Sequence, residues 1–549
     1  MSASDKKKLR KEQAAAQLSE RQRQEQAEAK KLKRITVAFV AIMLVVALTA
    51  VGVIGVRTVN NSGIIDRNTI AAITGEHQLN SVQMNYYLND YIRNWASSYG
   101  ENLSLYAGMM GLDVNKPISE QVTNQETGET WADQFLKDAM DKAKSDYALY
   151  DKAMAEGFKL SEDEQEALDM SGENMKLYAT LNGYSNVNAF LRAMYGYGSD
   201  TESFMEYNKV ATIAQAYYNK YNDGLKYDDA AIREHDNKNP NNYSAFNYVS
   251  YYVSTSSYLT GGTTDDKGNK TYSDAERAAA LKKAEEVANA LATSTNVEAL
   301  DKAIAALDIN KDKKDAASTK NTSIMYSSLP SALQSWIADK SRVAGNIASI
   351  ANESTSTDAD GKETKTINGY YVVIFQSRDE NLEPLKNVRH LLVKFTGGTT
   401  DDKGNTTYSD AEKAAAKAEA EKYLAEWKAG AKTEESFIEL VKKNSKDTTA
   451  ADGGLIEDIH RNSNLVPNFK NWSLDADRKP GDTEVIVSEY GYHVMYFVGN
   501  DEMTYRDYMI AEELRAADLD KWFKGITDAA SIKAVDTKRL NLDLVLAYM

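Results

Sequence analysis

The sequence predicts a multidomain protein of mixed α and α+β class. We expect an N-terminal transmembrane helix, a mostly helical domain, two tandem α+β modules and a C-terminal helix. Three observations predict this class: one uncharged apolar stretch near the N-terminus, apolar residues at helical spacing through residues 62–245, and an internal repeat in the second half. The chain has 549 residues, of which 42% are apolar, so it is long enough for several folded domains.

The first predicted element is a transmembrane helix at residues 35–56, a stretch without any charge. At about 1.5 Å per residue, a helix of this length spans roughly 33 Å, the thickness of the hydrocarbon core. The preceding 34 residues hold eleven Lys or Arg and five Asp or Glu. The positive-inside rule therefore places the basic tail, residues 1–34, in the cytoplasm and the bulk of the chain outside. A cleaved signal peptide is the alternative, but it needs a shorter apolar region and a small-residue cleavage site. We expect an uncleaved single-pass anchor in the cell membrane.

Composition excludes several kinds of site. The chain has no cysteine, which removes disulfides, Cys-ligated zinc, thiol nucleophiles and a lipid anchor on cysteine. The net charge is −16; without the +6 of the basic tail and the charge of Arg57, the remainder carries about −23. A surface of this sign repels nucleic acid and favours basic or unfolded polypeptide partners.

Residues 62–245 are expected to form the helical domain. A short hairpin with Gly75 in its turn comes first, and apolar spacing then predicts helices at about 161–181, 187–196 and 201–222. Aromatic stripes at this spacing usually form a core. The 33 tyrosines and 16 methionines of the chain are also suited to holding apolar segments of a partner. The polar stretch "DNKNPNNYS" ends the domain as a linker.

An internal repeat defines the two modules. "TGGTTDDKGNKTYSDAERAAA" at 260–280 returns at 396–416 with two differences. Each copy contains a capping box, S-D-A-E, that opens an Ala-rich helix. The acidic turn "DDKGN" lacks the ligand order of a calcium loop. "GYYVVIF" at 369–375 and "GYHVMYF" at 491–497 extend the similarity, so we place the modules at 246–378 and 386–500. Both read as strand, helices, loop, strand, strand, a pattern typical of an α+β unit.

Two histidines distinguish the second module from the first. His390 lies on the opening strand in "RHLLV", where the first copy has Tyr251 in "SYYVS". His493 lies on the closing strand, where the first copy has Tyr371. A single strand histidine is usually a core residue. Two that are both missing from a sister copy indicate a functional site at the centre of the second module.

Five segments of the second module resemble a known family. "VRHLLV", "SKD…GG", "LVPNF", "KPGD" and "YGYHV", in this order, resemble a parvulin-type (PpiC) peptidyl-prolyl cis-trans isomerase domain. The whole layout is similar to the SurA/PrsA group of extracytoplasmic foldases. That resemblance implies a chaperone role for residues 62–245. It also implies that the C-terminal helical segment at 501–549 packs on the chaperone domain.

The resemblance also implies roles for individual residues, and no cofactor or metal. The catalytic positions would be His390, Asp447, His493 and Tyr490. The proline pocket would be lined by Ile456, Leu465 and Phe469. The family usually ends its Gly-Gly loop with a further glycine, whereas this chain reads "GGLIED" with Glu457 at that position, so the loop around Ile456 departs from the pattern.

The leading hypothesis is a membrane-anchored foldase that isomerises X-Pro bonds in exported, unfolded polypeptides. The alternative is a non-catalytic holdase that uses the parvulin fold to bind peptides. A structural protein of the cell envelope would leave the paired histidines unexplained, and no H-E-x-x-H motif supports a metalloenzyme. The first module is interpreted as a degenerate copy that serves binding or spacing.

Overall fold

The computed structural model describes residues 6–8, 10, 59, 61–357, 361–401 and 405–548. The chain divides into two compact units, which are described separately. Unit 1 is Met1–Leu225 with Ala517–Met549, and unit 2 is Lys226–Ala516. The transmembrane helix expected at 35–56 lies outside the described residues. Within the described ranges, no helix combines the length and the apolar character that crossing a membrane requires.

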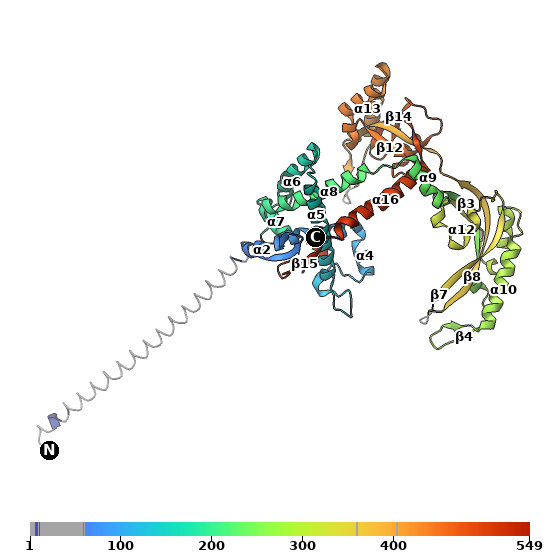
Figure 1. Ribbon diagram of the computed structural model, residues 1–549, viewed down its shortest axis with the longest axis horizontal. Helices are drawn as coiled ribbons and strands as arrows, with labels where there is room; N and C mark the ends of the chain where they lie inside the picture. Colours follow the sequence, from blue (N-terminus) through green and yellow to red (C-terminus); the bar gives the residue numbers. More distant parts are fainter. Residues whose placement is uncertain are drawn as a thin grey trace. The chain divides into compact units, whose positions relative to one another are not determined.

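Unit 1 is a helical domain in which a short β-hairpin precedes the main helices in the sequence (Figure 1). Its main elements are β1 (Ile70–Thr74), β2 (His77–Asn80), α3 (Ser81–Tyr99), α5 (Trp131–Ala155), α6 (Glu162–Leu181), α7 (Val187–Tyr195) and α8 (Thr201–Gly224). Capping boxes at Asn80, Thr130, Ser161 and Asp200 start four of these helices by satisfying their free N–H groups. Most of the surplus aromatic residues are core residues here, as in the buried cluster around Tyr86 and Phe204.

The C-terminal segment completes unit 1. β15 (Ile532–Ala534) pairs antiparallel with β1. In α16 (Tyr505–Thr527), the ring of Trp522 stacks on Tyr221 of α8, with centroids 4.0 Å apart and planes 7° from parallel. The segment from Ala517 onward therefore belongs to unit 1.

Unit 2 holds two modules of the same topology. The first contains β3 (Ala245–Ser254), α10 (Asp274–Leu291), α11 (Val297–Ala305), β6 (Thr319–Met325), α12 (Ser331–Ala338), β7 (Ile347–Thr357) and β8 (Glu363–Asp379). The second contains β9 (Pro384–Lys394), α13 (Asp410–Ala429), α14 (Glu434–Asn444), β12 (Leu455–Ile459), α15 (Pro467–Leu474), β13 (Thr483–Val487) and β14 (Gly491–Thr504). The strand orders are β6-β3-β8-β7 and β12-β9-β14-β13, so the opening and closing strands are central neighbours in both sheets.

Each sheet has two covered faces, because successive strand residues point to opposite sides. In the second module, Leu391 and Val393 pack with α13 and α14, while Val388, Met495 and Phe497 pack with α15. The first module repeats this arrangement with α10 and α11 on one face and α12 on the other. Figure 1 shows α10 running along the sheet of β3, β7 and β8.

The strand register corrects one expectation. In the second module His390 pairs with Met495, and the counterpart of Met495 in the first module, Val373, pairs with Ser250. The residue that replaces His390 is therefore Ser250 rather than Tyr251. Tyr251 lies on the other face, where its hydroxyl accepts a hydrogen bond of 2.9 Å from the amide of Asn310. The pairing with Tyr251 was wrong because the first module carries a four-residue 3-10 turn, Thr255–Tyr258, between its strand and the repeat. A one-residue shift in a strand moves a side chain to the opposite face.

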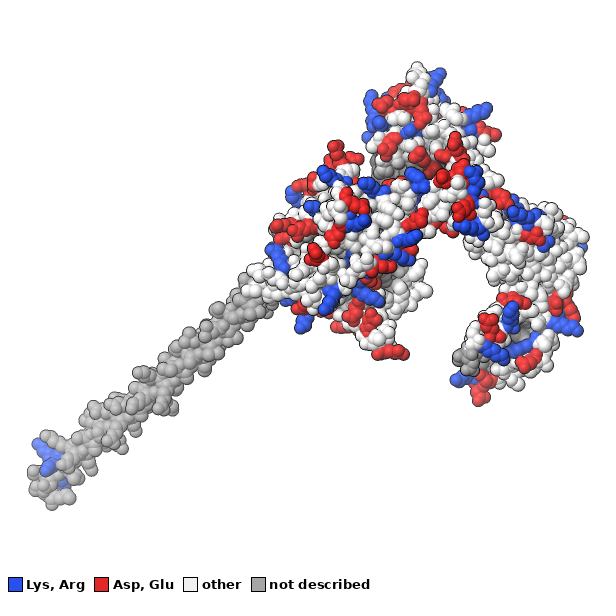
Figure 2. Space-filling model, in the orientation of Figure 1, with Lys and Arg blue, Asp and Glu red and all other residues white. Residues whose placement is uncertain are grey.

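A polar junction surrounds the start of α16 within unit 2. Helix α9 (Asp229–Lys238) takes the first residues of the stretch expected to be a linker, which leaves 239–244 as turns. The buried guanidinium of Arg506 donates hydrogen bonds to both carboxylate oxygens of Asp236, at 2.6 and 3.1 Å, and to the carbonyl of Pro240 at 2.6 Å. Over residues 61–548, Figure 2 shows acidic and basic side chains interspersed on the displayed face.

Candidate active site

The site lies on the face of the second sheet that α15 covers. β9 and β14 are adjacent and antiparallel, so His390 and His493 stand diagonally across the strand pair on the same face. Their Nδ1 atoms are 3.1 Å apart, and each residue is only 4% exposed. The pairing of the two central strands thus brings together two imidazoles that are separated by 103 residues.

The Gly-Gly loop is fitted against the backbone of His390. Gly453 and Gly454 both adopt left-handed conformations, with φ of 68° and 69°. A Cβ atom on Gly454 would lie 2.1 Å from the carbonyl oxygen of His390, and the N–H of His390 donates to the carbonyl of Gly454 at 2.9 Å. Only glycine allows this approach. The loop begins at Asp447, which caps the 3-10 turn Thr448–Asp452.

Asp447 faces the outer nitrogen of His390. Its Oδ1 atom lies 3.5 Å from Nε2 of His390. The same oxygen accepts hydrogen bonds from the backbone N–H and the hydroxyl of Thr449, at 3.0 and 2.8 Å. The interaction with His390, followed by the Thr449 bonds, holds the pKa of Asp447 well below its usual value, although partial burial opposes this. Asp447 is a carboxylate at neutral pH.

His493 is held in its neutral form. Burial lowers its pKa to about 4, and the neighbouring His390 adds to this effect. Its Nε2 atom lies 2.7 Å from the hydroxyl of Ser488. The polar groups form one continuous row. The Ser488 hydroxyl and Nδ1 of His390 are the partners of the two ring nitrogens of His493, and Nε2 of His390 faces the carboxylate of Asp447.

An apolar cluster borders the imidazoles. The Phe469 ring meets His390 and His493 nearly edge-on, with centroids 5.1 and 5.6 Å away. Ile456 and Leu465 pack in the same cluster as Phe469 and remain partly exposed. The residues expected to line a proline pocket are therefore gathered beside the two histidines.

Tyr490 joins the site through its backbone. Its N–H donates to the hydroxyl of Ser488 at 3.1 Å, and its carbonyl accepts from the N–H of Phe395 at 3.2 Å. The side chain is 57% exposed. Tyr490 thus fixes the loop that presents Ser488, and its ring faces solvent.

Comparison with known protein families decides what this arrangement is. A rotamase family model, the PPIC-type PPIASE domain, matches residues 390–499. The second module is a parvulin-type peptidyl-prolyl isomerase domain. The matched range begins at His390 and includes Asp447, His493 and the expected pocket residues Ile456, Leu465 and Phe469.

Solved structures with detectable likeness include two PrsA proteins and a SurA-like chaperone. PrsA of Bacillus anthracis is 18% identical, with a TM-score of 0.17, over 27% of this chain and 59% of that one. A SurA-like chaperone of Campylobacter jejuni is 17% identical, with a TM-score of 0.16, over 27% and 51%. PrsA of Bacillus subtilis is 13% identical, with a TM-score of 0.27, over 75% and 93%. The chain thus spans little more than half the length of the first two structures. No curated protein sequence matches it.

The isomerase domain contains two polar residues that sequence reasoning missed, Thr449 and Ser488. Each hydroxyl touches one end of the imidazole pair, at 3.4 Å from His390 and 2.7 Å from His493. Thr449 follows Asp447 by two residues, the spacing at which a side chain commonly bonds the acid that caps a turn. That spacing could have identified Thr449. Ser488 has no such signal, because its place depends on the fold of the β13–β14 turn.

The first module keeps the frame of the isomerase domain without its polar centre. In both copies an arginine stacks on a tryptophan, Arg342 on Trp336 and Arg478 on Trp472, with 4.3 Å to the ring centroid in each. Ser250 and Tyr371 replace the imidazoles, and the Tyr371 ring packs against Tyr252 at 4.8 Å. Within the described ranges of either module, no group of three His, Cys, Asp or Glu side chains is placed to hold a metal ion.

Proposed function

We propose that the chain is a membrane-anchored extracytoplasmic foldase. It catalyses cis-trans isomerisation of X-Pro bonds in exported polypeptides and binds their unfolded segments. The observation that supports the proposal most is the buried His390–His493 pair beside Phe469 in a parvulin-type domain. The anchor and its orientation rest on the apolar stretch 35–56 and the basic residues before it, with the N-terminus in the cytoplasm.

The reaction needs a shaped environment and no bond cleavage. Rotation about the X-Pro bond has a barrier of about 18–20 kcal/mol because the amide is conjugated. The domain would accelerate rotation by binding the twisted amide better than either planar form. Phe469, Leu465 and Ile456 would hold the proline ring, and the imidazole network would face the rotating amide with fixed dipoles. Because both ring nitrogens of His493 are engaged, no nucleophilic role is assigned to it.

A holdase is the second candidate function. It is favoured by the first module, which retains the fold after losing the histidines and the Gly-Gly loop. Unit 1 also exposes large apolar side chains, such as Met109 and Leu181 at 77% and 72%. In this case the second module would bind X-Pro segments without accelerating rotation about the X-Pro bond.

Exchange of cis and trans forms in a short Ala-Pro peptide, followed by NMR with the full-length chain, separates the two functions. Acceleration that is lost in a His390→Ala/His493→Ala variant would establish catalysis at this site. His77→Ala is the matched control, since His77 pairs with Asp151 in unit 1. Unaccelerated exchange with the native chain would leave only the holdase. Suppression of aggregation of an unfolded protein should be measured on the same samples.

A further inference from the structure

A large cavity lies among the helices of unit 1. It has a volume of about 1200 Å³ and opens between the end of α5, the α5–α6 connection, α6 and α8. This volume exceeds the range of typical small-molecule sites, about 300–1,000 Å³. A groove of this size suits a peptide segment.

The floor of the groove is apolar and rich in methionine. Leu168 and Ile213 are buried at its base, and Met205 packs on Gly172 where α6 and α8 meet. Met154 and Met170 remain 40% and 50% exposed. Methionine side chains are flexible and adapt to apolar partners of different shape.

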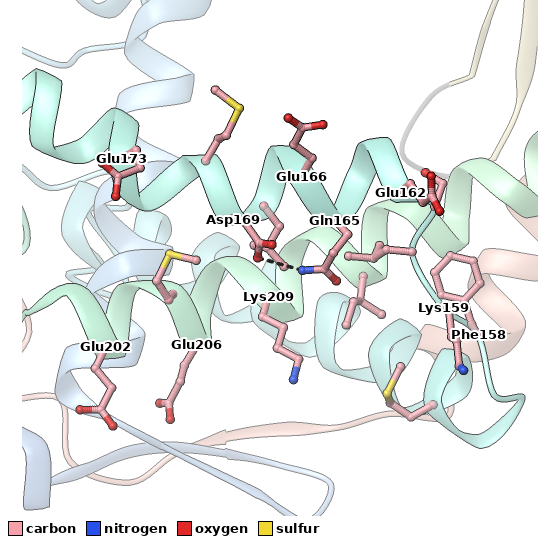
Figure 3. A pocket seen from close by; sticks show the side chains of 17 residues that line it. Phe158, Lys159, Glu162, Gln165, Glu166, Asp169, Glu173, Glu202, Glu206 and Lys209 are labelled. Atoms are coloured by element: carbon pink, nitrogen blue, oxygen red, sulfur yellow. Dashed lines mark hydrogen bonds between the residues drawn. The ribbon is translucent and has the colours of Figure 1, made fainter.

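The rim of the groove is acidic. Its carboxylates form a row on α6, at Glu162, Glu166, Asp169 and Glu173, and a second row on α8, at Glu202 and Glu206. The α6 residues are spaced four, three and four apart, so they share one side of the helix. Figure 3 shows Glu162, Glu166 and Glu173 projecting from α6, and Glu202 and Glu206 from α8. With Lys159 and Lys209 also lining the groove, six acidic and two basic side chains leave a net charge of −4.

Most of these carboxylates lack a cationic partner. Glu173 pairs with Lys176, and Asp169 accepts a hydrogen bond from Gln165 at 2.9 Å. The other four, Glu162, Glu166, Glu202 and Glu206, have no salt bridge to any residue that the structure describes. The rows therefore present unneutralised negative charge on both sides of an apolar floor.

We infer that this groove binds segments of unfolded polypeptides in which Lys or Arg residues flank a short apolar stretch. The apolar residues would cover the methionine floor, and the cationic side chains would reach the carboxylate rows. The inference deepens the foldase proposal and rests on it for the source of unfolded chains. It adds a charge preference that the isomerase domain does not supply.

Fluorescence anisotropy of labelled peptides with the full-length chain tests this. The peptides contain no proline, so that the isomerase domain does not compete for them. They share one apolar sequence flanked by Lys or by Glu, and a third keeps the Lys residues but has a polar centre. We expect the Lys-flanked apolar peptide to bind at least tenfold more tightly than the other two, and its affinity to fall with added salt. Equal binding of the Lys- and Glu-flanked peptides would overturn the inference.

Matched variants locate the site. Glu166→Gln/Glu206→Gln keeps the shape of the rim and should weaken binding about three- to tenfold. Asp163→Asn/Asp223→Asn removes two charges from the same helices outside the groove and should leave affinity unchanged. Met154→Ser/Met170→Ser should weaken binding. Met109→Ser should not, because Met109 is exposed elsewhere in unit 1.

Unchanged affinity in both groove variants would contradict the assignment, as would sedimentation showing a second copy of the chain bound there. X-Pro exchange measured on the same samples reports the isomerase separately, so either proposal can fail without the other.

Discussion

At the scale of single residues, the site depends on two imidazoles that their neighbours orient, one of which, His493, burial keeps neutral. Burial lowers the pKa of His493 to about 4 from 6.5. As the pH falls below about 6.5, the unfolded chain binds a proton at this position before the folded chain does. The free energy of unfolding is therefore unaffected by this group above about pH 6.5 and decreases as the pH falls from about 6.5 to 4. The total decrease from His493 is about 3 kcal/mol. The depressed pKa of Asp447 acts only at still lower pH, below its ordinary value near 3.8.

We predict that His493 titrates near pH 4 in the folded chain. Histidine-selective NMR can follow this, because the chain has only five histidines. A His493→Gln variant assigns the resonance by removing it, and His77 provides an internal reference in unit 1. A midpoint near 6.5 would show that the imidazole is hydrated and would contradict the closed network described above.

The hydroxyl groups at the two ends of the network offer a second prediction. Ser488→Ala removes the hydroxyl 2.7 Å from Nε2 of His493 and leaves that nitrogen without this hydrogen-bond partner. Thr449→Val removes one of the donors to Asp447. We expect each variant to lower the rate of X-Pro exchange by about three- to tenfold, since loss of one hydrogen bond costs about 0.5–1.5 kcal/mol. Thr448→Val is the control beside the site. An unchanged rate in both variants would mean that the hydroxyls do not orient the imidazoles.

At the scale of elements, the Gly-Gly loop leads from α14 into β12 and packs against β9, the strand that carries His390. We predict that Gly454→Ala destabilises the second module by more than about 2 kcal/mol and lowers its activity. The new Cβ atom would meet the His390 carbonyl at 2.1 Å in addition to the left-handed strain. Gly481→Ala is a matched control, because Gly481 also has a positive φ, 91°, but has no atom near its Cβ direction. Thermal unfolding should show a smaller loss for this control, about 1 kcal/mol. Similar losses in the two variants would exclude the close approach as the cause.

The strands, helices and turns around the two sites differ in how far the sequence could predict them. The paired histidines could be predicted from the duplication, because they lie on the strands that open and close the module, and Phe469 could be predicted from the resemblance to the parvulin family. The counterpart of His390 could not, because the Thr255–Tyr258 turn shifts the repeat relative to the strand in the first module. Ser488 could not either, since only the fold of the β13–β14 turn brings it to His493. The apolar floor of the unit 1 groove is composed from three separate segments, and no local pattern reveals it.

At the scale of the whole molecule, each unit is completed by parts distant in sequence. Strand β15 and the end of α16 complete unit 1, while the start of α16 belongs to unit 2. In unit 2 the buried Arg506 ties α16 to α9 through Asp236, to the following turn through Pro240, and to the connection between the modules through Glu380. An ion pair of this kind is strongly destabilising when one partner is removed, because the other group stays desolvated.

We predict that Arg506→Ala destabilises unit 2 by about 3 kcal/mol while leaving the isomerase centre intact. Denaturant unfolding should show the loss, and limited proteolysis should cut the connection between the modules, residues 380–383, more readily. The rate of exchange in a short Ala-Pro peptide should stay unchanged, because Arg506 touches no residue of the imidazole network. Arg233→Ala is the control: Arg233 forms an exposed pair with Asp229 at 3.6 Å on the same helix α9, and its loss should cost less than about 1 kcal/mol. If the exchange rate fell together with the stability, the catalytic geometry would depend on this junction, and the isomerase domain could not be treated as an independent part of unit 2.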